Sequence, residues 1–108
     1  AMTRKRVGQR TNRFTVGDLT LDTERRQAVR GGEEIPLLPK EYAILEHLVR
    51  HAGTVLSREQ LLDKVWGLDF EGGDRAVDAR IRGLRAALGQ AGGQIKTVFK
   101  SGYRLEEV

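Results

Sequence analysis

Residues 74–89 read DRAVDARIRGLRAALG, and this stretch decides the fold. At 100° per residue its apolar side chains fall on one narrow stripe, because they recur at the i, i+4, i+7 and i+11 spacing of a helix. They are Val77, Ile81, Leu84 and Leu88. We expect the Asp74 side chain to accept a backbone N–H at the amino end, and Gly89 to close the carboxyl end in a left-handed conformation. The stretch therefore predicts an amphipathic helix.

The other side of this helix is basic. It carries four arginines and two alanines, namely Arg75, Ala79, Arg80, Arg82, Arg85 and Ala86. Asp78 is the only acid inside the helix body, so the arginines lack the glutamates four residues earlier that would pair with them. Guanidinium groups bind phosphate and also match guanine N7 and O6, which suits a major groove. By itself, the helix fits a solvated basic surface equally well.

Composition limits the class of protein. The chain has 108 residues, of which 39% are hydrophobic, enough for one domain with one core. The absence of cysteine excludes disulfides and thiolate metal sites and fits a cytoplasmic location. No apolar run is long enough for a membrane span, and no signal-peptide pattern is present. The net charge is +4, with an acidic middle and a basic carboxyl-terminal part, so one pole is expected to attract polyanions.

The amino-terminal residues 1–13 are basic, polar and without periodicity. Ala1 and Met2 are typical of a cloning scar, and we interpret the remainder as a flexible linker. The ordered domain is expected to span residues 14–108.

Short alternating segments predict an antiparallel sheet of about four strands. The expected strands are Phe14–Val16, Leu19–Leu21, Gln27–Arg30 and Glu34–Leu37. Gly17–Asp18 and Gly31–Gly32 are turn signals between them, and Pro36 suits an edge strand.

A helix is expected to follow, with Pro39 at its first position and residues 40–52 as its body. Its apolar stripe is Leu45, Leu48, Val49 and Ala52. His47 and His51 have a spacing that can bind a metal, but no third ligand is evident. We therefore interpret both histidines as solvated and expect no metal site.

A second short helix is expected to begin at a capping box formed by Ser57 and Gln60 and to end at Trp66–Gly67. Residues 68–73 join it to the basic helix. Two helices joined by a short connection, the second of them basic, have helix-turn-helix order.

Residues 95–105 predict a β-hairpin with Lys100 at its tip. A basic hairpin directly after a basic helix is a wing, which can lie along the DNA backbone or enter a minor groove. We expect Lys100 to neutralise a phosphate, the alternative being that it only keeps an exposed turn soluble. Lys96 and Arg104 lie on the arms, where either can point back to the core. The elements together predict an α+β winged helix-turn-helix: a four-stranded antiparallel sheet, three helices and a carboxyl-terminal hairpin wing.

The chain resembles the winged-helix effector domain of OmpR/PhoB-type response regulators from Phe14 to Leu105. The resemblance lies in the order and spacing of short motifs. These are Leu37, Pro39, Glu41, Leu45, Leu48, Gly53, Val55–Arg58, Leu61, Val65–Gly67, Arg75, Val77–Asp78, Ile81–Arg82, Leu84–Arg85, Thr97–Val98 and Gly102–Arg104.

This resemblance implies sequence-specific binding of double-stranded DNA that regulates transcription, with no cofactor. It implies that Arg75, Ala79, Arg82 and Arg85 face the major groove. Helical spacing places Arg80 on the flank of the same helix, and we expect it to contact DNA as well. It also implies backbone contacts near Trp66, Thr97 and Tyr103.

The resemblance further implies several partners. They are an upstream receiver domain, a second copy bound head to tail on direct repeats, and RNA polymerase. The polymerase-contacting loop would include Leu68, Asp69, Phe70 and Glu71.

The chain departs from the family pattern at a few positions. Ala76 replaces a usual threonine, Arg80 a usual histidine and Gly83 a frequent arginine, and residues 99–101 replace an Arg-Gly-hydrophobic stretch at the wing tip. Gly83 either lowers helix propensity by about 1 kcal/mol relative to alanine or permits a close approach.

Protein binding and catalysis are two other classes of function on which the sequence bears. A winged helix can also bind an acidic protein, because fold alone does not determine function. An enzyme is not expected, since no catalytic constellation or phosphate-binding glycine loop is present. DNA binding is favoured because both the helix and the wing are basic, and one duplex can contact both.

Overall fold

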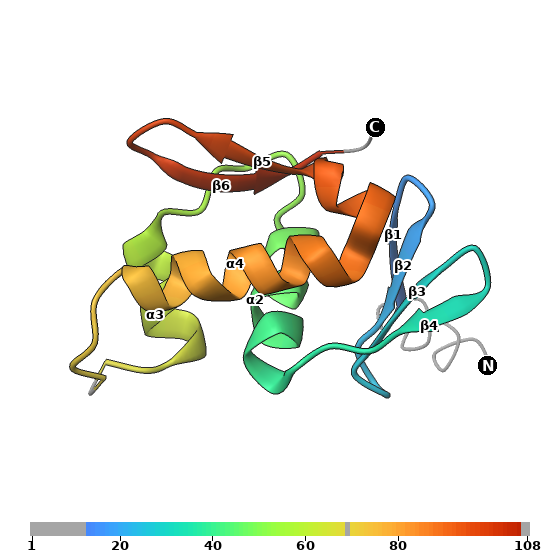
Figure 1. The fold of residues 1–108 in the computed structure, drawn as a ribbon, viewed down its shortest axis with the longest axis horizontal. Coiled ribbons are helices and arrows are strands. Elements are labelled where there is room, and N and C mark those ends of the chain that lie inside the picture. Colours follow the sequence, from blue (N-terminus) through green and yellow to red (C-terminus); the bar gives the residue numbers. More distant parts are fainter. Residues whose placement is uncertain (1–12, 69, 107–108) are drawn as a thin grey trace, which may run out of the picture.

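The computed structural model describes residues 13–68 and 70–106 of the chain (Figure 1). Most of the expected linker, residues 1–12, and Asp69 of the expected polymerase loop lie outside the described residues. The elements in chain order are β1 (Arg13–Val16), β2 (Leu19–Asp22), β3 (Gln27–Arg30), β4 (Glu33–Ile35), α2 (Pro39–Arg50), α3 (Arg58–Val65), α4 (Arg75–Leu88), the 3-10 helix η1 (Gly89–Gln94), β5 (Ile95–Val98) and β6 (Gly102–Leu105). The predicted α+β winged helix-turn-helix architecture is confirmed.

Strands β1 to β4 form an antiparallel sheet in chain order, as predicted. Gly31 and Gly32, with φ of 60° and 84°, form the β3–β4 turn, where two consecutive positive φ angles favour glycine. The sheet begins one residue earlier than expected, because Arg13 pairs with Asp22. Strand β4 ends at Ile35 rather than residue 37, because Pro36 has no N–H to donate to a ladder.

Helix α2 begins at Pro39, as predicted. Leu38 has no side-chain acceptor, and instead its own N–H donates to Glu41 Oε1 at 3.0 Å. The helix ends at Arg50, so the expectation that it continues through Ala52 was wrong. The backbone of its C-cap, His51, is not helical. Ala52 is exposed and does not belong to the buried stripe.

Helix α3 begins at the predicted capping box. The Gln60 N–H donates to Ser57 Oγ at 2.9 Å, and the Ser57 N–H donates to Gln60 Oε1 at 2.8 Å. Two otherwise free donors are thereby satisfied, which fixes where the helix starts. Leu61 is its fully buried side chain, and Trp66 is the C-cap.

Helix α4 buries its predicted stripe completely. Val77, Ile81, Leu84 and Leu88 are each no more than 2% exposed. The expected cap was wrong, since Asp74 has a helical conformation and its side chain accepts no capping hydrogen bond. Its backbone oxygen accepts the Val77 N–H at 3.0 Å instead.

The carboxyl end of α4 differs from expectation in part. Gly89 has the expected positive φ of 63°, but its ψ of −122° is not that of a left-handed helix. The glycine-rich segment that follows, Gly89–Gln94, forms the 3-10 helix η1. Arg30 Nη1 donates to the Leu88 carbonyl at 3.2 Å, which satisfies a carbonyl at the helix end.

Gly83 permits a close approach between helices, one of the two roles considered for it. A Cβ at this position would collide with the Glu41 carboxylate of α2. The space is therefore used inside the fold, between α4 and α2, rather than at the outer face of α4.

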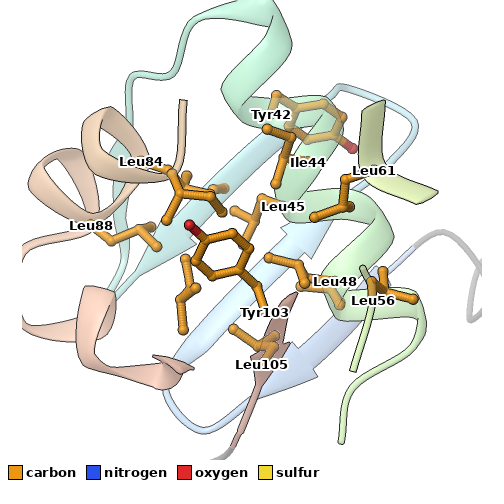
Figure 2. Packing of buried hydrophobic residues seen from close by; sticks show 14 of the residues in the cluster. Tyr42, Ile44, Leu45, Leu48, Leu56, Leu61, Leu84, Leu88, Tyr103 and Leu105 are labelled. Carbon is orange, nitrogen blue, oxygen red and sulfur yellow. The ribbon is translucent and has the colours of Figure 1, made fainter. Parts of the chain in front are cut away.

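The core lies where the three helices meet the sheet and the hairpin (Figure 2). Leu45 and Leu48 of α2, Leu61 of α3 and Leu84 of α4 are fully buried in one cluster. Leu105 brings β6 into the same cluster, so the wing is anchored in the core that holds the basic helix.

We predict that Leu84→Ala lowers the free energy of unfolding by about 2–5 kcal/mol, because a cavity remains in a fully buried site. Chemical denaturation checks the value. The matched control is Leu38→Ala, which truncates a leucine that is 53% exposed and should cost far less. Equal losses for the two variants would contradict the observed orientation of α4.

Candidate nucleic-acid interface

The outer face of α4 carries two exposed arginines that have no partner among the described residues. Arg75 and Arg82 are exposed, and within residues 13–68 and 70–106 neither forms a hydrogen bond or an ion pair. They lie seven residues apart, two turns along one side of the helix. Ala79 lies between them, half-buried, and Ala86 is exposed one turn beyond Arg82. This strip combines long basic side chains with small ones, so a partner can approach the backbone closely.

Arg85 has a different environment from these two. Its Nη2 donates to the Ile95 carbonyl at 2.7 Å and to Thr97 Oγ1 at 2.9 Å. Its guanidinium carbon lies 5.7 Å from the centre of the Tyr103 ring. Two residues expected at DNA, Arg85 and Thr97, are therefore bonded to each other and join α4 to the wing. Arg80 is half-buried on the flank of α4.

Asp78 connects three elements. Its Oδ1 accepts the Tyr103 hydroxyl at 2.6 Å and Arg58 Nε at 2.9 Å. Burial is the main cause that raises the pKa of the Tyr103 hydroxyl, and the hydrogen bond to Asp78 raises it further. The one acid in the body of α4 therefore ties this helix to the start of α3 and to β6.

Tyr103 is a buried wing residue, at 5% exposure, although it was expected near the DNA backbone. Its backbone exchanges hydrogen bonds with Leu56, at 2.8 and 3.0 Å. Gly102 makes this pairing possible, because a Cβ there would collide with the Leu56 carbonyl. The base of the wing is consequently held against the segment that leads into α3.

The tip of the wing comprises Phe99, Lys100 and Ser101, between the paired residues Val98 and Gly102. Lys100 is exposed at the predicted position, in a left-handed conformation with φ of 62°. Phe99 is 82% exposed, and Lys100 Nζ lies 5.4 Å from its ring centre.

The two basic residues on the wing arms are cross-strand partners with different environments. Lys96 is exposed, whereas Arg104 is half-buried and forms an ion pair with Glu106. Of the two residues considered, Lys96 is therefore the one available to a ligand.

A groove of about 370 Å³ separates the wing tip from the start of α3. Its walls are formed by Ser57, Arg58 and Glu59 of the α3 start, by residues 97–102 of the wing, and by Asp74 before α4. Hydroxyl groups, two cations and two carboxylates thus surround one depression beside the amino end of α4.

The connection between α3 and α4 exposes apolar surface. Leu68 is 83% exposed, and Phe70 is 38% exposed, with its ring centre 5.8 Å from that of Trp66. Trp66 is half-buried, and Lys40 Nζ lies 5.6 Å from its ring centre while donating to the Val65 carbonyl at 3.1 Å. Glu71 is exposed.

The two histidines differ from each other. His51 is exposed, but His47 is half-buried, and burial lowers its pKa. Describing both as solvated was therefore wrong for His47. Over residues 13–68 and 70–106, no group of three or more His, Cys, Asp or Glu side chains could hold a metal ion. None of the helices described there is long and apolar enough to cross a membrane.

Sequence reasoning missed the roles of Arg58 and Asp78 as connectors and the exposure of Phe99. Asp78 stood out as the only acid in a basic helix, which was a usable signal. The contact of Arg58 with it joins residues 20 positions apart, which helical periodicity does not reveal.

Known proteins match this chain closely. The family described as "Transcriptional regulatory protein, C terminal" matches residues 32–105. The regulatory protein VanRB of Enterococcus faecalis is 42% identical over 103 residues, which cover 95% of this chain and 46% of that protein. The chain thus spans less than half the length of this curated relative.

Solved structures match as well. The DNA-binding domain of Klebsiella pneumoniae RstA, in complex with the RstA box, is 35% identical with a TM-score of 0.78, covering 89% of this chain and 98% of that one. The response regulator DrrB, a Thermotoga maritima OmpR/PhoB homologue, is 31% identical with a TM-score of 0.80, covering 95% of this chain and 49% of that one. The resemblance to OmpR/PhoB-type regulators is confirmed, and the chain belongs to the family of carboxyl-terminal domains of transcriptional regulatory proteins.

Proposed function

We propose that this chain is the sequence-specific DNA-binding output domain of a two-component response regulator. Helix α4 enters the major groove, and the β5–β6 wing contacts the backbone or the minor groove beside it. The observation that carries the proposal is the pair of exposed, unpartnered guanidinium groups of Arg75 and Arg82 on one side of α4, among the residues described. The RstA domain that this chain resembles was solved with its DNA box, which supports a DNA partner.

The rigidity of α4 supports direct readout. Its inner stripe is fully buried, so the helix cannot rotate without losing core contacts. The helix therefore directs the side chains of Arg75 and Arg82 outward from constant backbone positions, from which each can reach a guanine in the bidentate geometry. Because the side chains of Ala79 and Ala86 are small, the backbone of α4 can approach the base edges of a groove closely.

The remaining candidate residues have different roles in this proposal. Lys100 and Arg80 neutralise phosphates. Arg85, Thr97 and Tyr103 hold the wing at a set angle to α4 and act mainly through that positioning. Trp66 lies near the DNA backbone in this proposal, and Lys40 lies beside its ring.

Further partners follow from family membership. We propose that a receiver domain precedes this domain in the full-length protein and that two copies bind direct repeats head to tail in the cytoplasm. The exposed Leu68 and Phe70, with Glu71, form the surface for RNA polymerase. Asp69 was expected in the same surface.

We predict that selection from a random DNA pool yields a defined motif, and that Arg82→Ala weakens binding by about 1–3 kcal/mol and relaxes one or two positions. The physical reason is the loss of a bidentate base contact. Arg25→Ala removes the same charge from an exposed turn of the sheet and serves as the control. An unchanged motif would make Arg82 a phosphate contact. Binding of an acidic protein without any DNA motif would favour the interaction-module alternative.

We predict that two copies bind cooperatively when their half-sites lie about 10–11 bp apart, because both then face the same side of the duplex. Inserting about 5 bp turns one copy to the opposite side and should abolish cooperativity. Gel-shift titrations on the two duplexes measure this. Equal cooperativity on both would indicate independent monomers.

We predict that Lys100→Ala weakens binding to all sequences about equally and reduces the slope of log affinity against log salt by about one, since one fewer counterion is released. Titrations at several salt concentrations measure the slope. Lys64→Ala, which removes an exposed lysine from α3, is the control. A changed motif with an unchanged slope would mean that Lys100 reads bases.

A further inference from the structure

The connection between α4 and the wing is short and rich in glycine. It consists of η1, Gly89–Gln94, in which Gly89, Gly92 and Gly93 make up half of the residues. Glycine has more backbone freedom than any other residue, so this segment does not by itself hold the following strand in one orientation. The contacts that η1 makes with the rest of the fold therefore decide where the wing begins.

The last residue of this connection is a buried glutamine. Gln94 is 3% exposed, and its Nε2 donates to the Val16 carbonyl at 3.0 Å and to the Glu106 carbonyl at 3.2 Å. A side-chain amide nitrogen carries two N–H groups, and both are used here. The two acceptors lie at the end of β1 and directly after β6. One side chain thus joins the four-stranded sheet to the base of the wing.

The start of the connection is tied to the same sheet. Arg30 of β3 donates from Nη1 to the carbonyl of Leu88, the residue immediately before η1, at 3.2 Å. In Figure 1 the sheet lies at the end of α4 from which the wing starts. The four-stranded sheet therefore holds the connection at both of its ends, through side chains that are far from it in the sequence.

The β1–β2 turn fits closely against the glutamine. A Cβ on Gly17 would lie 3.2 Å from Gln94 Nε2, and Gly17 has a positive φ of 65°. A larger residue at this position would have to displace the amide or the turn. The fit restricts where the Val16 carbonyl can lie relative to the end of η1.

The hydrogen bond from Arg85 to the wing depends on this arrangement. Arg85 Nη2 donates to the carbonyl of Ile95, the residue directly after Gln94. The position of Ile95 follows from where η1 ends, so the hydrogen bonds of Gln94 and Arg85 act in series. Removing the Gln94 donors would free the start of β5, and the acceptor of Arg85 would then move with it.

We propose that Gln94 and Arg30 are positioning residues for DNA binding, through which the four-stranded sheet fixes the orientation of the wing relative to α4. This inference rests on the proposed function. It gives a part in DNA binding to a sheet that carries none of the candidate DNA contacts. The wing is preorganised by the sheet, so less conformational freedom is lost when DNA binds.

The first test measures the orientation of the wing in the protein without DNA. The chain has no cysteine, so spin labels can be attached specifically at Ser101→Cys on the wing tip and Ala86→Cys on α4. Asp74 lines the depression beside the wing tip, and position 86 lies about 18 Å further along the helix. Double electron–electron resonance should give a narrow distance distribution for the otherwise wild-type protein.

Methionine variants remove the donors while keeping an unbranched side chain. Gln94→Met and Arg30→Met should each broaden the distance distribution. The matched controls are Gln27→Met, a half-buried glutamine of β3 without a side-chain hydrogen bond among the described residues, and Arg25→Met in an exposed turn. Both controls should keep the narrow distribution.

The second test measures DNA binding by unlabelled protein on a duplex with one selected half-site. Gln94→Met should raise the Kd about three- to tenfold with an unchanged motif, because a mobile wing must be ordered on binding. Lys100→Ala should weaken binding in the wild-type background but have little further effect in Gln94→Met. Such non-additivity indicates coupling between the two positions, which general destabilisation of a still folded protein does not produce.

Two results would overturn the inference. One is a distance distribution as narrow as that of the wild type in both methionine variants, and the other is an equal effect of Lys100→Ala in the two backgrounds. Arg30→Met takes the place of Gln94→Met in the binding test if thermal melts show that Gln94→Met does not fold. Failure of the proposed function is distinguishable, because the distance measurement needs no DNA, whereas that failure would leave the wild-type protein without a selected motif.

Discussion

Burial of the apolar stripe of α4 is the interaction on which the rest of the structure depends. Val77, Ile81, Leu84 and Leu88 pack against α2, α3 and the wing, and none is more than 2% exposed. Each such side chain stabilises the fold by roughly 1.5–3 kcal/mol. Because one side of the helix is held inward, Arg75 and Arg82 on the other side are held outward. The free energy of folding therefore also sets the orientation of the face that we propose binds DNA.

The wing adds a second constraint, which is polar. Asp78 accepts hydrogen bonds from Tyr103 and Arg58, and Arg85 donates to β5. Two charged side chains of α4, Asp78 and Arg85, therefore have a structural role, because their hydrogen bonds orient the wing relative to the helix. Removing the Asp78 carboxylate would leave the part-buried Tyr103 hydroxyl without this acceptor, which costs more than the bond itself contributes. The orientation of the β5–β6 wing relative to α4 is thus set in the protein without DNA.

Much of this protein could be determined from the sequence by itself. The period of 3.6 in residues 74–89 is a local property of the chain, and it correctly identified the buried stripe of α4. The capping box of Ser57 and Gln60 and the glycine pair of the β3–β4 turn are equally local, and both were found where expected. The order of these elements, with the motifs shared with OmpR/PhoB-type regulators, was sufficient for fold and family.

The tertiary structure alone decided which polar residues are free. Sequence spacing placed Arg82 and Arg85 on one basic surface, but Arg85 reaches Ile95 and Thr97, while Arg82 has no partner among the described residues. It also decided that Gly83 makes room for a buried carboxylate of α2 rather than for DNA. The physical reason is that periodicity describes one element at a time. Hydrogen bonds between elements join residues far apart in the chain, and their geometry exists only once the core has packed.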